Sequence, residues 1–174
     1  MAVDAERLYV NVHVGGILTS TDGGRTLAPT IDLHHDVHQV SVGNDGRVWA
    51  ATGMKALAES RDAGRTWAYH KAGLHARYLT CAVPTDEGVL VAASSGHRAR
   101  DGAVYRFDGD AFELCADGLP ERFPGTIDTR RLAASGKVAA VAGLDGRLYV
   151  SQDAGRTWEV IAEDLPEVRA VVIG

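Results

Sequence analysis

Short runs of alternating apolar and polar residues, separated by turn residues, recur along the whole chain. The clearest group begins with the run 37–42, which a Gly-Asn-Asp-Gly turn at 43–46 separates from a second run at 47–52. Two further runs follow at 56–60 and 66–70, on either side of an Asp-Ala-Gly turn. Period-two alternation indicates β-strands, and such turns between β-rich runs are typical of hairpins. This part of the chain is predicted to form four antiparallel strands.

The same scheme returns near the C-terminus and, in shortened form, at the N-terminus. Runs at 131–134 and 138–141 lead, through a Leu-Asp-Gly turn, to runs at 147–151 and 157–161. At the N-terminus the run 8–14 leads directly into the next strand, so the first copy lacks its innermost strand. The chain is therefore predicted to be all-β and repetitive.

One turn motif occurs three times without gaps, in the pattern S-x-D-[GA]-G-R-T-[WL]. Its copies are Ser20–Leu27, Ser60–Trp67 and Ser151–Trp158, which start 40 and 91 residues apart. Because the second interval is about twice the period of one repeat, a degenerate copy is expected within it. The segment Tyr105–Phe112 keeps the Asp, the Gly and the closing aromatic residue. A period of about 40–45 residues is that of one propeller blade.

The repeats predict a single β-propeller array over residues 1–174, built of about four four-stranded blades. The C-terminal run Val168–Gly174 has the pattern of an innermost strand. We therefore expect the C-terminal strand to complete the first blade, within the chain or across a dimer. The predicted blades are 7–33 together with 167–174, then 36–74, 75–119 and 126–165.

Three arrangements satisfy this closure. The chain closes a four-bladed ring by itself, or two chains exchange terminal strands to form one larger propeller, or the chain is the C-terminal part of a larger propeller. A half-open propeller on its own is not expected, because it would expose strand edges and core.

The turn motif resembles the Asp-box, also called the bacterial neuraminidase repeat. Asp-boxes occur in sialidases, sortilin-type receptors, some glycosidases and plant photosystem assembly factors. The resemblance implies a propeller whose boxes lie on the outer rim, away from the central site. A structural role also follows from chemistry, because the Asp accepts hydrogen bonds within its turn, the Gly adopts a positive φ and the aromatic residue covers the hairpin. The box residues assigned to this role are Asp22, Gly24, Thr26, Asp62, Gly64, Thr66, Trp67, Asp153, Gly155, Thr157 and Trp158.

The amino-acid composition mainly serves to exclude some classes of protein. Glycine is frequent, at 20 of 174 residues, which fits many tight turns. A net charge of −5 argues against non-specific binding of nucleic acid, which needs a basic surface. The two cysteines, Cys81 and Cys115, are too few for a disulfide framework and are predicted to be free, buried thiols.

No membrane attachment or export signal is indicated. Residues 1–7 carry acidic side chains where a signal peptide needs a basic segment and then an apolar core. No apolar run approaches the roughly 20 residues that span a bilayer. We predict a soluble, cytoplasmic protein with no cofactor, no nucleic-acid partner and no membrane partner, although Met1 need not be the start of the parent protein.

A ligand pocket is expected where the innermost strands begin, near the axis of the propeller. When these strands are aligned, their first residues place several charged side chains on one face. This is more charge than the structure of an innermost strand requires. Arginines from several blades could hold a carboxylate there, because guanidinium binds it in a bidentate fork. The candidate ligand-binding residues are Asp36, His38, Arg77, Tyr78, Asp128, Arg130 or Arg131, and Arg169.

Histidines concentrate in the first half of the chain. In the segment His34-His-Asp-Val-His38, Asp36 and His38 could share one strand face and supply two ligands to a metal ion. The candidates for a third ligand are His13 and His75. The sequence by itself assigns no metal site, because no third ligand can be chosen without the fold.

The favoured function is a non-enzymatic binding or scaffold module for a small acidic ligand, a glycan or a protein partner. No complete catalytic constellation is present in the sequence. One alternative is a sialidase-like glycoside hydrolase or lyase that uses axial carboxylates and arginines, with Asp36, Asp128 and Tyr78 as candidates. The chain lacks the Arg-Ile-Pro segment of sialidases, so no catalytic residue is assigned. The other alternative is a metal-dependent enzyme built on the histidines.

Overall fold

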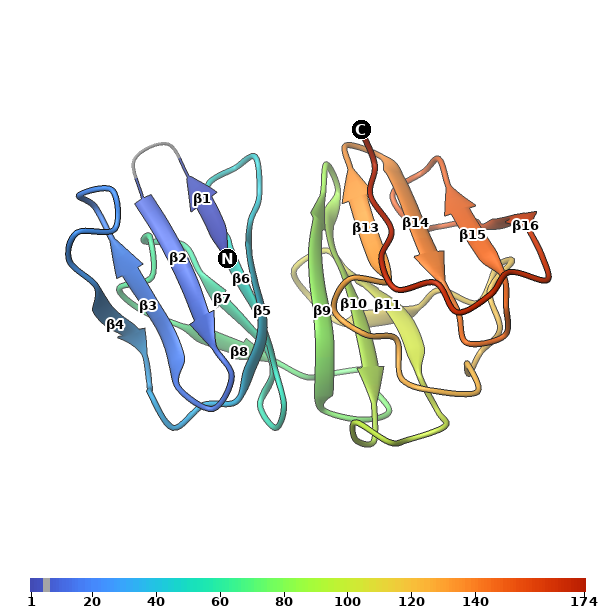
Figure 1. The fold of residues 1–174 in the computed structure, drawn as a ribbon, viewed down its shortest axis with the longest axis horizontal. Coiled ribbons are helices and arrows are strands. Elements are labelled where there is room, and N and C mark those ends of the chain that lie inside the picture. Colours follow the sequence, from blue (N-terminus) through green and yellow to red (C-terminus); the bar gives the residue numbers. More distant parts are fainter. Residues whose placement is uncertain (5–6) are drawn as a thin grey trace.

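Four four-stranded antiparallel sheets make up the protein, and each sheet forms one blade (Figure 1). The structure is a computed structural model that describes residues 1–4 and 7–174. Every strand pairs with the strand that precedes or follows it in the chain. The predicted all-β architecture of four propeller blades is therefore confirmed.

The strands of the four blades follow one another in chain order. The first blade consists of β1 (Ala2–Asp4), β2 (Arg7–Val12), β3 (Gly16–Ser20) and β4 (Ala28–Ile31). The second consists of β5 (Val37–Val42), β6 (Val48–Thr52), β7 (Ala56–Ser60) and β8 (Ala68–His70). The third consists of β9 (Tyr78–Thr85), β10 (Gly88–Ser94), β11 (Ala103–Phe107) and β12 (Phe112–Leu114). The fourth consists of β13 (Leu132–Ser135), β14 (Val138–Ala142), β15 (Leu148–Ser151) and β16 (Glu159–Ala162).

The hydrophobic core lies between neighbouring blades. Tyr9 and Ile17 of the first blade belong to a buried cluster shared with the second. Trp49 of the second blade meets Phe107 of the third edge to face, with ring centroids 6.2 Å apart. Tyr149 of the fourth blade belongs to a cluster shared with the third. Because each sheet is covered by the next, the blades stabilise one another in sequence.

Both cysteines are free and buried, as predicted. Burial raises the pKa of Cys81 and of Cys115 to about 12. Neither thiol is therefore a reactive thiolate at neutral pH. The Cys81 thiol instead donates to the carbonyl of Asp128 at 3.3 Å, which ties the third blade to the chain that enters the fourth.

The C-terminal segment does not complete the first blade, contrary to the expectation from the sequence. The innermost strand of that blade is β1, which pairs antiparallel with β2. Residues 163–174 contain no strand, and the last of them run beside β13, where the Val171 N–H donates to the carbonyl of Arg130, just before that strand, at 2.8 Å (Figure 1). β1 and β2 are close in sequence, so their pairing costs little entropy, whereas pairing with the C-terminus would require the two end blades to meet. Within one chain the predicted first blade, 7–33 with 167–174, is therefore not formed, and its completion across a dimer stays a prediction.

The four blades form an open row, not a closed ring. Within residues 1–4 and 7–174, the first blade does not pack on the fourth, and the two lie at opposite ends of the molecule (Figure 1). Apolar side chains are exposed on both end blades, with Val3 64% and Ile161 57% exposed. The ring closed by one chain is therefore not formed, while the dimer and the larger propeller stay predictions.

The three repeated turns have the same hydrogen bonds. In each, the Thr N–H and hydroxyl donate to the Asp carboxylate, at 2.8–2.9 Å and 2.7 Å. The Ser hydroxyl donates to the same carboxylate and accepts from the Gly N–H, which is 2.8 Å away in all three turns. The Gly residues have φ values of 86–88°. Each turn joins the third and fourth strands of a blade, so these Asp residues have a structural role far from the innermost strands.

Acid is expected to weaken all three turns. Hydrogen bonds from Thr26 and Thr66 lower the pKa of Asp22 and Asp62 from 3.8 to about 2. Burial of Asp153 acts in the opposite direction, but the N–H and hydroxyl of Thr157 outweigh it and its pKa is also about 2. A carboxyl group whose pKa is lower in the folded protein stabilises the fold. This stabilisation is fully present above the pKa of the unfolded chain, 3.8, and is lost as the pH falls toward 2.

Thermal unfolding of wild type and Asp153→Asn from about pH 5 to about pH 2 tests this expectation. Asp153→Asn should unfold at a lower temperature at neutral pH and show a flatter dependence on pH. An unchanged slope in the variant would contradict the role given to this carboxylate.

Candidate functional site

Residues from three blades meet where the innermost strands begin. Asp36 precedes β5, Tyr78 begins β9, and Asp128 precedes β13. Burial raises the pKa of Tyr78, and the carboxylates of Asp36 and Asp128 raise it further. The ring of His38 packs against Tyr78 with centroids 4.6 Å apart. The structure therefore brings His38 and Tyr78 together at the starts of β5 and β9.

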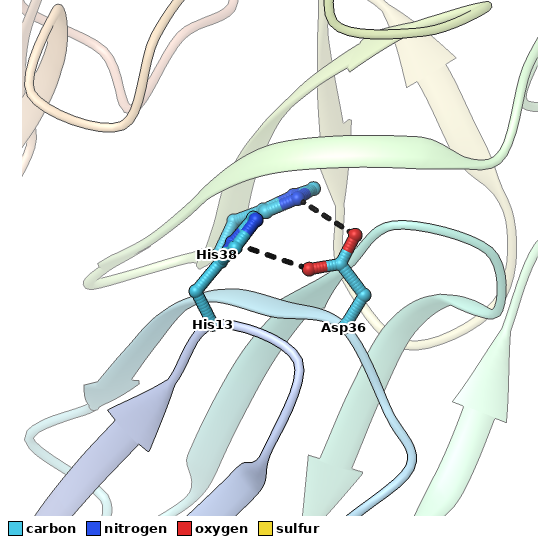
Figure 2. Close-up of side chains that lie close together, drawn as sticks. All are labelled: His13, Asp36 and His38. Carbon is cyan, nitrogen blue, oxygen red and sulfur yellow. Dashed lines mark ion pairs between the residues drawn. The ribbon is translucent and has the colours of Figure 1, made fainter.

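Two histidines converge on one carboxylate (Figure 2). His13 Nδ1 lies 3.3 Å from Asp36 Oδ1, and His38 Nε2 lies 3.2 Å from Asp36 Oδ2. The two imidazole rings stack at a centroid distance of 5.5 Å. His13 comes from the β2–β3 turn, Asp36 directly precedes β5 and His38 lies at its start, so the first and second blades build this cluster together.

Arginines at and before the start of β13 and in the C-terminal segment line a hollow of about 380 Å³. Arg131 is buried, and its guanidinium donates to Glu167 Oε1 at 2.6 Å. Arg130 and Arg169 are exposed and form no ion pair within the part of the chain that the structure describes. The residues that line the hollow are Asp128, Thr129, Arg130, Arg131, Glu167 and Arg169. A second hollow shares Asp128, Arg131 and Glu167 with it and adds His97, Arg98 and Arg100.

Two predicted site residues lie outside these groups. Arg77 is exposed and enters no ion pair among residues 1–4 and 7–174. The His75 ring accepts or donates a hydrogen bond with the Tyr105 hydroxyl at 2.8 Å and lies 3.7 Å from Asp101 Oδ2, so it is not the third member of the histidine cluster. Burial lowers the pKa of His75, and the nearby Arg122 lowers it further.

Sequence reasoning did not select Glu167 as a site residue, although it pairs with Arg131. Nor did it select Arg98 and Arg100, which belong to a polar loop after β10. The density of basic residues between positions 97 and 100 indicates an exposed loop that could flank a pocket, but it does not single out these two arginines. No pattern in the sequence indicates that Glu167 pairs with Arg131, because this ion pair depends on how the C-terminal segment returns to β13.

The chain has the fold of β-propeller proteins. It superimposes on a GH74 xyloglucanase from Xanthomonas campestris with a TM-score of 0.70 at 16% identity, covering 91% of this chain and 28% of that one. The extracellular domain of BT4673 from B. thetaiotaomicron gives a TM-score of 0.66 at 14% identity, over 98% of this chain and 23% of that one. YCF48 bound to D1 peptide gives 0.51 at 14% identity, over 92% and 66%. At these identities the likeness shows the fold alone.

The chain spans about a quarter of the length of the xyloglucanase and of the BT4673 domain. No family model and no curated protein matches the sequence. The described chain has no helix with the length and apolar character needed to cross a bilayer. The chain therefore shares the propeller fold with these proteins, and its ligand must be inferred from its own residues.

Proposed function

We propose that this chain is a non-enzymatic binding module of the Asp-box type, and that its axial face binds a carboxylate-bearing ligand. The observation that carries the proposal is the hollow in which Arg130 and Arg169 are exposed and unpaired within the described residues. A guanidinium that has no carboxylate partner can form charge-assisted, bidentate hydrogen bonds with a ligand. The repeated turns support the Asp-box part of the proposal through their shared hydrogen bonds.

The pairing of Arg131 with Glu167 supports this assignment of roles. Arg131 is 5% exposed and already has a partner, so it shapes the hollow and leaves recognition to the exposed arginines. The net charge of the chain is −5, so a local excess of arginine is not a general property of its surface. An acidic peptide and a small carboxylate both present the group that this hollow would recognise.

Removing the exposed arginines is expected to abolish binding of a carboxylate probe. A hydrogen bond to a charged group contributes about 1.5–3 kcal/mol, so each of Arg130→Ala and Arg169→Ala should weaken citrate binding about tenfold or more. Titration calorimetry with citrate at low ionic strength measures the effect, and an acidic peptide serves as a second probe.

Arg25→Ala is the matched control, because Arg25 is also exposed but lies in the first blade. It should bind citrate as the wild type does. If the double variant of Arg130 and Arg169 binds both probes with unchanged affinity, the arginine hollow is not the binding site.

A glycoside hydrolase is the second candidate function. Asp36 and Asp128 precede the innermost strands of two blades and both raise the pKa of Tyr78, which favours it, because glycosidases place two carboxyl groups around the bond they cleave. Hydrolysis of xyloglucan or of an aryl glycoside by the wild type, and its loss in Asp128→Asn, would support an enzyme. Absence of turnover with both substrates would leave the binding module as the function.

Two further expectations stay predictions. A homodimer would cover the exposed apolar side chains of the end blades, and light scattering tests it by comparing the solution mass with the 18.5 kDa of one chain. A mass of one chain would argue against the dimer. The cytoplasmic location also stays a prediction, to which the extracellular domain among the similar structures gives no support.

A further inference from the structure

The cluster of His13, Asp36 and His38 lies outside the arginine hollow, and carboxylate binding does not use it (Figure 2). We propose that this cluster binds a divalent transition-metal ion of the zinc type. The ligand atoms are His13 Nδ1, the Asp36 carboxylate and His38 Nε2. Imidazole nitrogen and carboxylate oxygen are ligands that zinc takes in proteins, where three protein ligands commonly leave a fourth position open.

The hydrogen bond of His38 determines which of its ring nitrogens can bind a metal. His38 Nδ1 lies 2.5 Å from the carbonyl oxygen of Leu79. A carbonyl can only accept, so Nδ1 carries the proton and the neutral ring has its lone pair on Nε2. Nε2 lies 3.2 Å from Asp36 Oδ2, which is also an acceptor. Two acceptors at this distance repel each other unless a cation or a second proton lies between them.

Burial makes it unfavourable for the polar atoms of this cluster to remain without a partner. The His38 side chain is only 7% exposed. Within the described part of the chain, neither His38 Nε2 nor Asp36 Oδ1 has a hydrogen-bond partner, although both atoms are buried. Buried polar atoms are nearly always partnered, and an unpartnered one calls for an explanation such as an ion. A metal ion at this point would satisfy both atoms at once.

The spacing of the ligand atoms suits a metal of this size. All three residues offer ligand atoms within 4.8 Å of one another, and the two His–Asp separations are 3.2 and 3.3 Å. Bonds of about 2.0–2.1 Å in tetrahedral geometry separate neighbouring ligand atoms by about 3.4 Å. The His13 side chain is 71% exposed on the β2–β3 turn, so it can move the short distance that closes the site.

The surroundings also orient the buried ligand. A histidine that binds a metal almost always donates its other ring N–H to a carbonyl or carboxylate, as His38 does to Leu79. The Tyr78 ring packs against His38 and limits its rotation. The competing explanation is a His38 ring that carries two protons and forms an ion pair with Asp36, which requires no metal.

Titration of the metal-free chain with zinc chloride distinguishes the two explanations. The wild type should bind one equivalent of zinc, and His38→Gln and Asp36→Asn should each weaken binding by at least about 100-fold, since even residues that only orient a ligand change affinity by about 10–100-fold. His34→Gln is the matched control, because His34 is exposed in the same connection and should leave binding unchanged. Cobalt(II) provides a second readout, since a tetrahedral site gives it strong visible absorption.

His13→Gln keeps the test valid if the buried variants fail to fold, because so exposed a side chain contributes little to folding. This variant should also bind zinc more weakly, and the visible spectrum of its cobalt(II) complex should lose intensity. If the wild type binds no zinc, or if His13→Gln and His38→Gln bind it as the wild type does, the cluster is an ion pair and the proposal is overturned.

Discussion

Replacing Phe107 by alanine is expected to lower the free energy of unfolding by about 3–5 kcal/mol. The Phe107 side chain is 1% exposed and lies where the second and third blades meet. Its ring contacts three others, those of Trp49, His70 and Phe112, at centroid distances of 6.2, 4.7 and 4.6 Å. Removing it leaves a cavity among aromatic rings that cannot collapse without moving two sheets.

Urea denaturation followed by circular dichroism measures the loss. Leu27→Ala is the control, since Leu27 is 48% exposed and its removal should change stability by no more than about 0.5 kcal/mol. A smaller m-value in Phe107→Ala would show that the two halves of the row unfold separately. A loss of less than about 1 kcal/mol would contradict the packing of the second blade on the third.

Replacing Gly118 by alanine is expected to cost about 2–5 kcal/mol. Gly118 has a φ of +84°, a left-handed conformation that costs a residue with a Cβ about 1–2 kcal/mol. An added Cβ would also collide with the backbone carbonyl oxygen of Trp158, and overpacking of this kind costs about 1–3 kcal/mol. The neighbouring Asp117 carbonyl accepts from the Trp158 N–H at 2.9 Å, so the collision falls on the contact between the third and fourth blades.

Gly46→Ala separates the two contributions to this loss. Gly46 has a φ of +76°, but an added Cβ there would meet no atom within 4 Å. It should therefore show only the backbone cost of about 1–2 kcal/mol. Thermal or urea unfolding of both variants gives the difference. Equal losses would mean that the third and fourth blades are not in contact at Gly118.

The sequence predicted the regular part of the fold well, for a physical reason. The runs 37–42 and 56–60 coincide with β5 and β7, because alternating side chains and flanking turn residues act locally. The short strand Ala2–Asp4 carries too few residues to show alternation, and it was missed. The C-terminal run alternates like a strand but forms none, because pairing depends on a partner edge that local pattern cannot reveal.

The candidate site was predicted in part. Asp36, His38, Tyr78 and Asp128 could be placed together because they occupy equivalent positions before or at the start of innermost strands. His13 was one of two candidates for the same cluster, and only the folded β2–β3 turn brings it to Asp36 while His75 pairs elsewhere. Glu167 needed the return of the chain to β13, which no spacing encodes.

The pairing of every strand with its chain neighbour has a consequence for how quickly the protein can fold. Short loops close at small entropic cost, and proteins dominated by such local pairings fold faster than other β-proteins of similar size. No blade has to wait for a strand from the far end of the chain, since β1 replaces the C-terminal segment in the first blade. During synthesis, each blade that emerges can dock on the one before it, so the nascent protein never has to keep an incomplete first blade open for its last residues.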